Sequence, residues 1–122
     1  MILADTSVWI DHLRSGNKEM GSLLNRGEIV IHPLVIAELA LGSLQDRDTT
    51  LALLDDLPQT RVAELAEVRH LIEARRLYAL GLGLIDIHLI ASVLISPGTS
   101  LWTRDKPLRK TTELLRIHVD LP

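Results

Sequence analysis

The sequence has no cysteine and only three aromatic residues, Trp9, Tyr78 and Trp102. Without cysteine the protein can form neither a disulfide framework nor a thiolate metal site, and nothing favours an oxidising compartment. We therefore expect a cytoplasmic protein. Three scattered aromatic rings are also too few to build a platform on which nucleic-acid bases stack.

Two further absences concern membranes and polyanions. No stretch approaches the roughly 20 apolar residues that cross a bilayer, and no basic segment precedes the apolar residues at the N-terminus. We expect a protein that is neither exported nor embedded in a membrane. The net charge of -3 gives no overall attraction to nucleic acid, so any contact with RNA must be local.

The composition itself is typical of a soluble globular domain. Hydrophobic residues make up 47% and charged residues 24%, which is far from the composition of a disordered chain. A chain of 122 residues can bury one core, and no repeat or Gly/Ser linker divides it. We expect residues 1–122 to form a single domain.

Short strand-like runs alternate with helical patterns along the chain. The predicted strands are Ile2–Asp5, Glu28–His32, Thr60–Ala63, Ser100–Thr103 and Ile117–Val119. The predicted helices are Asn17–Arg26, Pro33–Ser43, Thr49–Leu57, Ala66–Leu80, Ile85–Ile95 and Lys106–Leu115. Such alternation favours an α/β fold in which helices cover both faces of a parallel sheet.

Acidic residues interrupt apolar segments at four places. In MILADTSVWIDH the apolar run ends on Asp5, and in SLWTRDK a late strand is followed by Asp105. Open parallel sheets bind ligands beyond the carboxyl ends of their strands, so both acids are expected at one edge. Asp86 starts the apolar helix of GLIDIHLIAS, and Glu38 is the one ionisable group in PLVIAELALGSL, where a lone buried carboxylate is costly.

These acids have two interpretations. Asp is a preferred helix N-cap, and Asp5, Asp86 and Asp105 all lie where a helix could start. Capping does not explain Glu38 in the middle of a helix, whereas carboxylates that converge on one edge require a cation. Oxygen ligands without cysteine or a His-x-x-x-His pair suit Mg²⁺ or Mn²⁺ better than zinc, so we interpret the five histidines as structural or solvated.

Four segments together resemble the PIN-domain ribonucleases, and within them the VapC-type toxins of VapBC toxin–antitoxin pairs. The segments are ILADTSVWIDHL, PLVIAELALGSL, GLIDIHLIAS and LWTRDKPL, in this order. The resemblance implies a three-layer α/β/α sandwich with a parallel sheet of about five strands. It also implies a Mg²⁺- or Mn²⁺-dependent endoribonuclease that forms a homodimer and is inhibited by a cognate antitoxin, whose Arg or Lys enters the acidic pocket.

The resemblance assigns the catalytic and metal-binding pocket to Asp5, Glu38, Asp86 and Asp105. Asp5 and Asp86 are the expected direct metal ligands, while Glu38 and Asp105 ligate the metal or orient its waters. The hydroxyls of Thr6 or Ser7 and of Thr103 are supporting ligands or ordinary helix caps. Many relatives carry one more acid where this chain has Pro107, so the resemblance leaves open whether one ion or two bind.

Basic residues surround Asp105 and are candidates for contacts with the RNA backbone or for a solvated helix face. They are Arg104, Lys106, Arg109 and Lys110. Arg75 lies within the apolar stripe of a predicted helix, and we leave it out of the site because an arginine stem can reach solvent along such a stripe.

Two rival functions remain at this point. A phosphoacceptor receiver domain has the same size and a Lys-Pro after a late strand, as Lys106-Pro107 does here, but it needs an acidic pair where this chain has Asp5-Thr6-Ser7. The other rival is a catalytically silent PIN-like module that only binds other proteins, and the presence of all four acids weighs against it.

Overall fold

A parallel β-sheet of three strands runs through the middle of the molecule. The computed structural model describes residues 1–122, and its strands are β1 (Ile2–Ala4), β2 (Ile29–Val30) and β3 (Ser100–Trp102) in the order β2-β1-β3. Leu3 of the central strand pairs with Val30 on one side and with Leu101 on the other. All three carboxyl ends therefore meet at the same edge of the sheet.

The two predicted outer strands are reduced to single residue pairs. Ile31 bridges to Gln59 and Leu101 bridges to His118, both in parallel, so five chain segments lie side by side, although only three of them form strands. The first bridge begins one residue before the predicted Thr60–Ala63. Two hydrogen bonds hold this bridge, from Ile31 N–H to the Pro58 carbonyl (2.9 Å) and from Thr60 N–H to the Ile31 carbonyl (3.0 Å).

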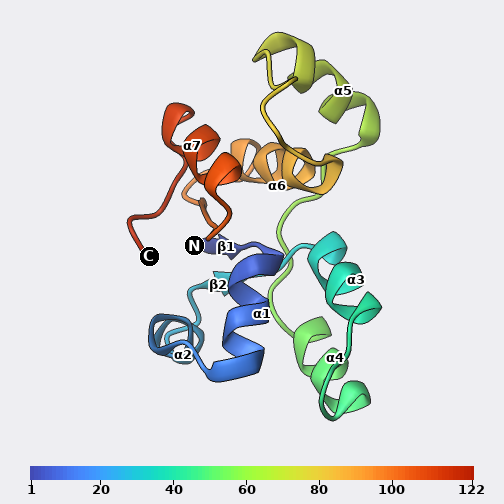
Figure 1. Ribbon diagram of the computed structural model, residues 1–122, viewed down its shortest axis with the longest axis vertical. Coiled ribbons are helices and arrows are strands. Elements are labelled where there is room, and N and C mark those ends of the chain that lie inside the picture. The colour runs from blue at the N-terminus through green and yellow to red at the C-terminus, as the bar shows by residue number, and fades with distance from the viewer.

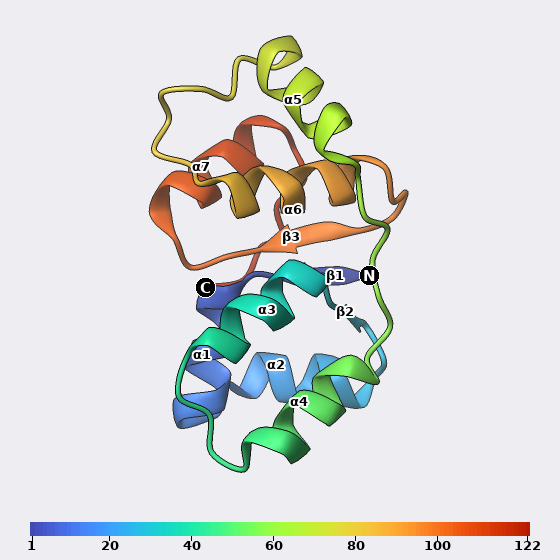
Figure 2. The same cartoon turned by 90° about the vertical axis from the view of Figure 1, so that its right-hand side faces the viewer.

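Helices cover both faces of the sheet, as Figures 1 and 2 show. One layer contains α1 (Thr6–Ser15), α2 (Lys18–Asn25), α3 (Pro33–Leu41) and α4 (Arg47–Asp55). The other contains α5 (Leu65–Ala74), α6 (Leu84–Leu94) and α7 (Lys106–Leu114), with α5 packed on α6. The predicted α/β/α sandwich is thus confirmed. No helix combines the length and apolar character needed to span a bilayer.

Two helices differ from the sequence prediction by more than two residues at an end. The first is α1, which the predicted helices did not include; it begins after its N-cap Asp5 and ends at Gly16, where φ is 73°. The second is α5, which was predicted to reach Leu80 but ends at Ala74. There Arg76 takes the left-handed conformation (φ 53°) and the N–H of Leu77 bonds to the Ile72 carbonyl (2.9 Å), a helix stop that glycine usually makes.

One continuous apolar core holds the sheet between the two layers. Leu3 and Trp102 on the strands are almost completely buried, together with Val8 from one layer and Leu108 from the other. Burial on both faces fixes the strand register, and hence the positions of the residues that follow each strand. At the opposite edge of the sheet, the amino group of Met1 donates to the carbonyl of Gly98 (2.8 Å).

Candidate active site

Asp5 ends the central strand and starts the first helix. Its backbone N–H still bonds to the Trp102 carbonyl (2.9 Å), and its carboxylate accepts the N–H of Val8 (3.1 Å) as the N-cap of α1. The residue is only 5% exposed. The charge that ends the buried strand is therefore a helix cap, held against the edge of the sheet.

Side-chain hydroxyls hold this carboxylate and that of Glu38. Ser7 Oγ donates to Asp5 Oδ1 (2.5 Å), and Thr103 Oγ1 donates to Asp5 Oδ2. Thr6 Oγ1 donates to Glu38 Oε1 (2.5 Å). A carboxylate offers about four acceptor positions, so Asp5 keeps about one after its bonds to Ser7, Thr103 and Val8. In this structure the three hydroxyls act as partners of acids.

Glu38 projects from the middle of the apolar helix α3. Apart from Thr6 Oγ1, no hydrogen-bond partner of its side chain is present, and the residue is partly buried. Because α3 packs beside α1, Glu38 lies close to the start of α1 and to Asp5. This position explains how an otherwise apolar helix accommodates a carboxylate.

Asp86 and Asp105 reach the same place from the other helical layer. Asp86 lies in the first turn of α6, where Oδ2 accepts the N–H of Gly83 (2.9 Å). Asp105 is the N-cap of α7, and its Oδ2 accepts the N–H of Leu108 (3.1 Å). Capping thus applies to both residues and to Asp5, and the two interpretations of these acids are compatible.

The acids converge on a small cavity of about 180 Å³. Its lining comprises Asp5, Thr6, Ser7, Glu38, Asp86, Leu89 and Asp105. Every polar side chain among them offers oxygen, which is the donor type that Mg²⁺ and Mn²⁺ prefer. The donor set therefore fits such an ion, although no three of these acids form a ligand cluster as they stand. Thr103 is not part of the lining and acts behind Asp5.

Burial is the main influence on the acids with shifted pKa values. Burial raises the pKa of Asp5 above its ordinary value, against the opposing effect of the bonds from Ser7, Thr103 and Val8. Burial also raises the pKa of Asp86, and the negative charges of Asp105 and Glu38 raise it further. Repulsion between the carboxylates therefore contributes to the raised pKa values, but removal from water has the larger effect.

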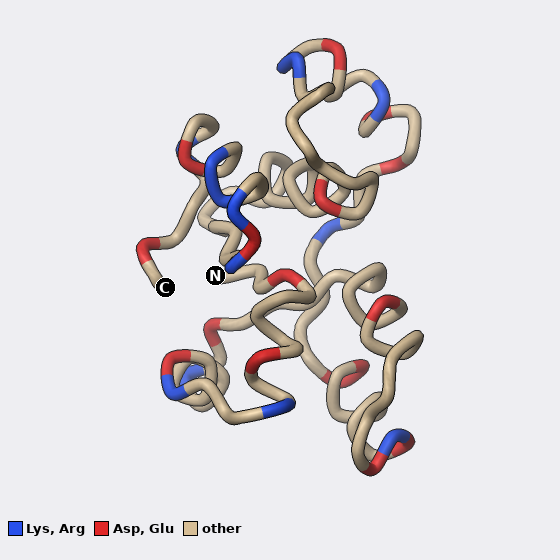
Figure 3. Tube along the Cα trace, viewed as in Figure 1, with Lys and Arg blue, Asp and Glu red and all other residues tan.

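The basic residues near Asp105 are placed differently from one another. Figure 3 shows basic segments of the chain within α7. Lys106 and Lys110 are exposed and form no ion pair, whereas Arg109 bonds to Glu113 (3.2 Å) and to the Leu121 carbonyl (2.5 Å). Arg104 forms an ion pair with Asp11 of α1 (2.7 Å). Contact of these residues with RNA stays a prediction.

Sequence reasoning missed Asp11 and its partner Asn17. Asn17 Nδ2 donates to Asp11 Oδ2 (3.0 Å), on the side of Asp11 away from Arg104. No helix was predicted over Thr6–Ser15, so nothing placed Asp11 on the face that Arg104 reaches. Arg75 is an exposed C-cap of α5, outside the cavity lining, in agreement with its exclusion.

Comparison with known proteins places this geometry in context. Residues 2–114 match the family model of the PIN domain. The chain is also 50% identical over 109 residues to "Ribonuclease VapC32" of Mycobacterium tuberculosis, in strain CDC 1551 / Oshkosh and in strain ATCC 25618 / H37Rv. Each alignment covers 89% of this chain and 88% of the relative.

Proposed function

Because the chain belongs to the PIN-domain family, we propose that it is a metal-dependent endoribonuclease and the toxin of a toxin–antitoxin pair. The observation that carries this proposal is the convergence of Asp5, Glu38, Asp86 and Asp105 on one cavity at the carboxyl edge of the sheet. The high identity to a ribonuclease over most of both chains supports the same reaction.

In the proposal, the acids hold Mg²⁺ or Mn²⁺. All four line the cavity; Asp5 and Asp86 are assigned as the direct ligands, and Glu38 and Asp105 complete the site. Such an ion lowers the pKa of bound water and neutralises charge that grows on the phosphate. The hydroxyls of Thr6, Ser7 and Thr103 fix the orientations of Asp5 and Glu38.

The RNA backbone approaches from the side of α7. A cavity of carboxylates repels phosphate, so cations beside it are needed to bring the backbone close. Lys106 and Lys110 are exposed and free of ion pairs, and Lys106 directly follows Asp105. We therefore assign the first RNA contacts to these two lysines.

The antitoxin binds next to the catalytic cavity. A larger cavity of about 500 Å³ lies between α1 and the end of α3, and Glu38 lines both cavities. Ile10, Leu13 and Leu44 give it an apolar lining that suits an amphipathic helix, and a Lys or Arg of that helix reaches Glu38 and the acids beyond. Such a cation competes with the metal, so the complex is inactive. Homodimerisation, which the family resemblance implies, is part of the same proposal.

The test is cleavage of a defined RNA by the purified protein in Mn²⁺ or Mg²⁺. Cleavage is expected with either metal and should be lost in EDTA. In Asp5→Asn and Asp86→Asn the cleavage rate should fall by a factor on the order of a hundred or more, because each variant loses a metal ligand. The side-chain oxygen of asparagine can still accept the N–H of Val8 at position 5 and the N–H of Gly83 at position 86, so both variants should fold. They also control for contaminating nuclease.

Cleavage that persists equally in both variants contradicts the assignment of the site. Absence of cleavage in wild type under every metal condition favours the catalytically silent module. The match to the PIN domain spans residues 2–114 and therefore argues against the receiver alternative.

A further inference from the structure

The turn between β3 and α7 is fastened to α1 at three points. The Thr103 hydroxyl donates to Asp5 Oδ2, and the backbone N–H of Arg104 donates to Ser7 Oγ (3.0 Å). The guanidinium of Arg104 forms the third link, to Asp11 Oδ2 (2.7 Å). These links join residues almost a hundred positions apart in the sequence, and they lie beside the cavity that Asp5, Ser7 and Asp105 line.

The first two links form relays from backbone to carboxylate. The N–H of Arg104 donates to the Ser7 hydroxyl, and the N–H of Asp105 donates to the Thr103 hydroxyl, both at 3.0 Å. These hydroxyls donate onward to Oδ1 and Oδ2 of Asp5. A hydroxyl has one proton to give, so each relay has a fixed direction and aims its proton at Asp5. The position of the turn therefore sets the orientation of the Asp5 carboxylate.

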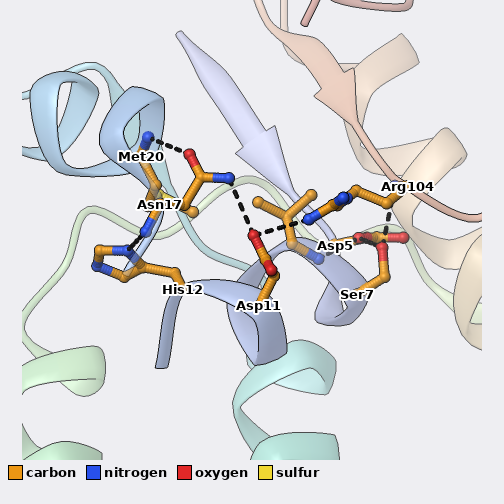
Figure 4. Close-up of polar contacts among 8 residues, drawn as sticks. Asp5, Ser7, Asp11, His12, Asn17, Met20 and Arg104 are labelled. Atoms are coloured by element: carbon orange, nitrogen blue, oxygen red, sulfur yellow. Dashed lines mark hydrogen bonds and ion pairs between the residues drawn. The ribbon is translucent and has the colours of Figure 1, made fainter. Parts of the chain in front are cut away.

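The third link is supported from behind by the junction of α1 and α2, as Figure 4 shows. Asn17 Nδ2 donates to Asp11 Oδ2 (3.0 Å), while Asn17 Oδ1 caps α2 by accepting the N–H of Met20 (3.0 Å). His12 Nδ1 accepts the N–H of Asn17 (3.1 Å). The bond from Asn17, followed by the charge of Arg104, lowers the pKa of Asp11, so Asp11 is ionised near neutral pH.

We propose that the ion pair of Arg104 with Asp11 positions the acidic cavity, by holding the β3–α7 turn at the distance from α1 that both relays require. This role rests on the proposed function, because it matters only if the cavity binds a metal. Arg104 is a positioning residue: it acts on Asp5 through Ser7 and on Asp105 through the turn. An exposed arginine beside a nuclease site would otherwise be assigned to the RNA backbone, and its engagement with Asp11 argues against that.

The test measures Mn²⁺ binding to the metal-free protein by calorimetry, and RNA cleavage as a function of Mn²⁺ concentration. Arg104→Ala and Asp11→Asn should each raise the Mn²⁺ Kd about tenfold, the lower end of the effect of groups that orient metal ligands. The double variant should raise it no further, because both changes break one link. Arg104→Lys keeps the charge and should recover part of the loss.

Arg26→Ala is the matched control, because Arg26 forms a comparable exposed ion pair with Glu28 (3.0 Å) outside the cavity lining. Its Mn²⁺ Kd should equal that of wild type. The positioning role is overturned if Arg104→Ala leaves the Mn²⁺ Kd unchanged. If Arg104→Ala instead raises only the KM for RNA, and Asp11→Asn leaves that KM unchanged, Arg104 contacts the RNA. Wild type that binds no Mn²⁺ and behaves like Asp5→Asn refutes the proposed function itself, and the positioning role with it.

Discussion

Asp5 uses one carboxylate for two purposes. It caps α1 through the N–H of Val8, and it faces the acidic cavity with about one acceptor position left. Removal of the side chain would therefore change both the fold and the site, whereas Asp5→Asn keeps a good cap, removes the charge and leaves one of the two hydroxyls without its acceptor oxygen. At this residue the choice of substitution decides what an experiment reports.

Asp86 allows the electrostatic cost of the empty site to be measured. Its raised pKa means that the folded state disfavours the charged form, so this group lowers stability as pH rises through its unfolded pKa of about 3.8 and through its higher folded pKa. At neutral pH the metal-free protein carries the whole cost. Asp86→Asn should therefore melt at the same temperature as wild type or higher in EDTA.

Added Mn²⁺ should reverse the order of the two proteins. Wild type gains about 2.7 kcal/mol at a hundredfold excess of metal over Kd, whereas Asp86→Asn gains little. Asp48→Asn is the control, because Asp48 is an exposed acid in the first turn of α4 and lies outside the cavity lining. If Asp86→Asn is much less stable than wild type in EDTA, the charged form of Asp86 stabilises the metal-free fold, and the predicted electrostatic cost is contradicted.

Among the elements, α3 depends on an unusual cap. His32 is completely buried, and its Nδ1 accepts the N–H of Leu34 (3.0 Å), which requires that nitrogen to be unprotonated. Burial, with a smaller effect of His88, lowers the pKa of His32 to about 4. The helix that carries Glu38 is thus anchored by a neutral imidazole.

This anchor predicts a loss of stability in mild acid. Between pH 6.5, the ordinary pKa of histidine, and about pH 4, His32 is protonated in the unfolded chain but stays neutral in the folded protein. As pH is lowered through this window, the free energy of unfolding should decrease, and this group contributes at most about 1.4 kcal/mol per pH unit to the decrease. His32→Asn keeps a capping side chain and should remove this contribution, as measured by denaturant unfolding in EDTA at several pH values.

The difference between wild type and His32→Asn isolates the effect of this histidine, because the buried acids titrate in both proteins. Asp5 and Asp86 act with the opposite sign, because each adds stability as pH falls through its raised folded pKa. His70→Asn, a change at an exposed position of α5, should leave the wild-type pH dependence intact. Parallel curves for wild type and His32→Asn would contradict the prediction.

Local sequence signals predicted most elements, and tertiary contacts decided the others. Asn17 and Pro33 marked true helix starts, and the sandwich with its parallel sheet is confirmed. The early end of α5 was missed because an arginine, Arg76, adopts the left-handed turn for which sequence patterns indicate glycine. The bridge at Gln59 depends on a neighbouring strand far away in sequence, so no local pattern could set its length.

The acids of the candidate site were predictable because each one interrupts an apolar segment. Their metal-binding roles stay predictions. The ion pair of Asp11 with Arg104 could not be predicted, because charged residues on a polar helix face look alike until the fold brings one partner to the other. The hydroxyl partners of Asp5 and Glu38 were named as candidates, but their direction of hydrogen bonding required the structure.

At the scale of the whole molecule, the acidic cavity lies between the two helical layers. Glu38 comes from α3 in one layer and Asp86 from α6 in the other, while Asp5 and Asp105 follow two neighbouring strands. Neither layer contains the site by itself. Metal binding should therefore stabilise the entire fold and not a single part of it.

This arrangement predicts one cooperative unfolding transition for residues 1–122. Far-UV circular dichroism follows all the helices, whereas tryptophan fluorescence follows Trp9 in α1 and Trp102 in β3, both of which are buried. The two melting curves should coincide, and Mn²⁺ should move both by the same amount. A fluorescence change that precedes the loss of helix would indicate two independently unfolding parts.

The contact between Met1 and Gly98 lies at the edge of the sheet opposite the acids. Gly98 belongs to an exposed turn with φ of 79°, and nothing surrounds the position where a side chain would be. A fluorescent dye, an affinity peptide or a surface tether attached at this turn would thus leave the acidic cavity and the larger cavity beside it accessible. The parallel sheet thus places a site for attaching a label at the edge opposite the acidic cavity.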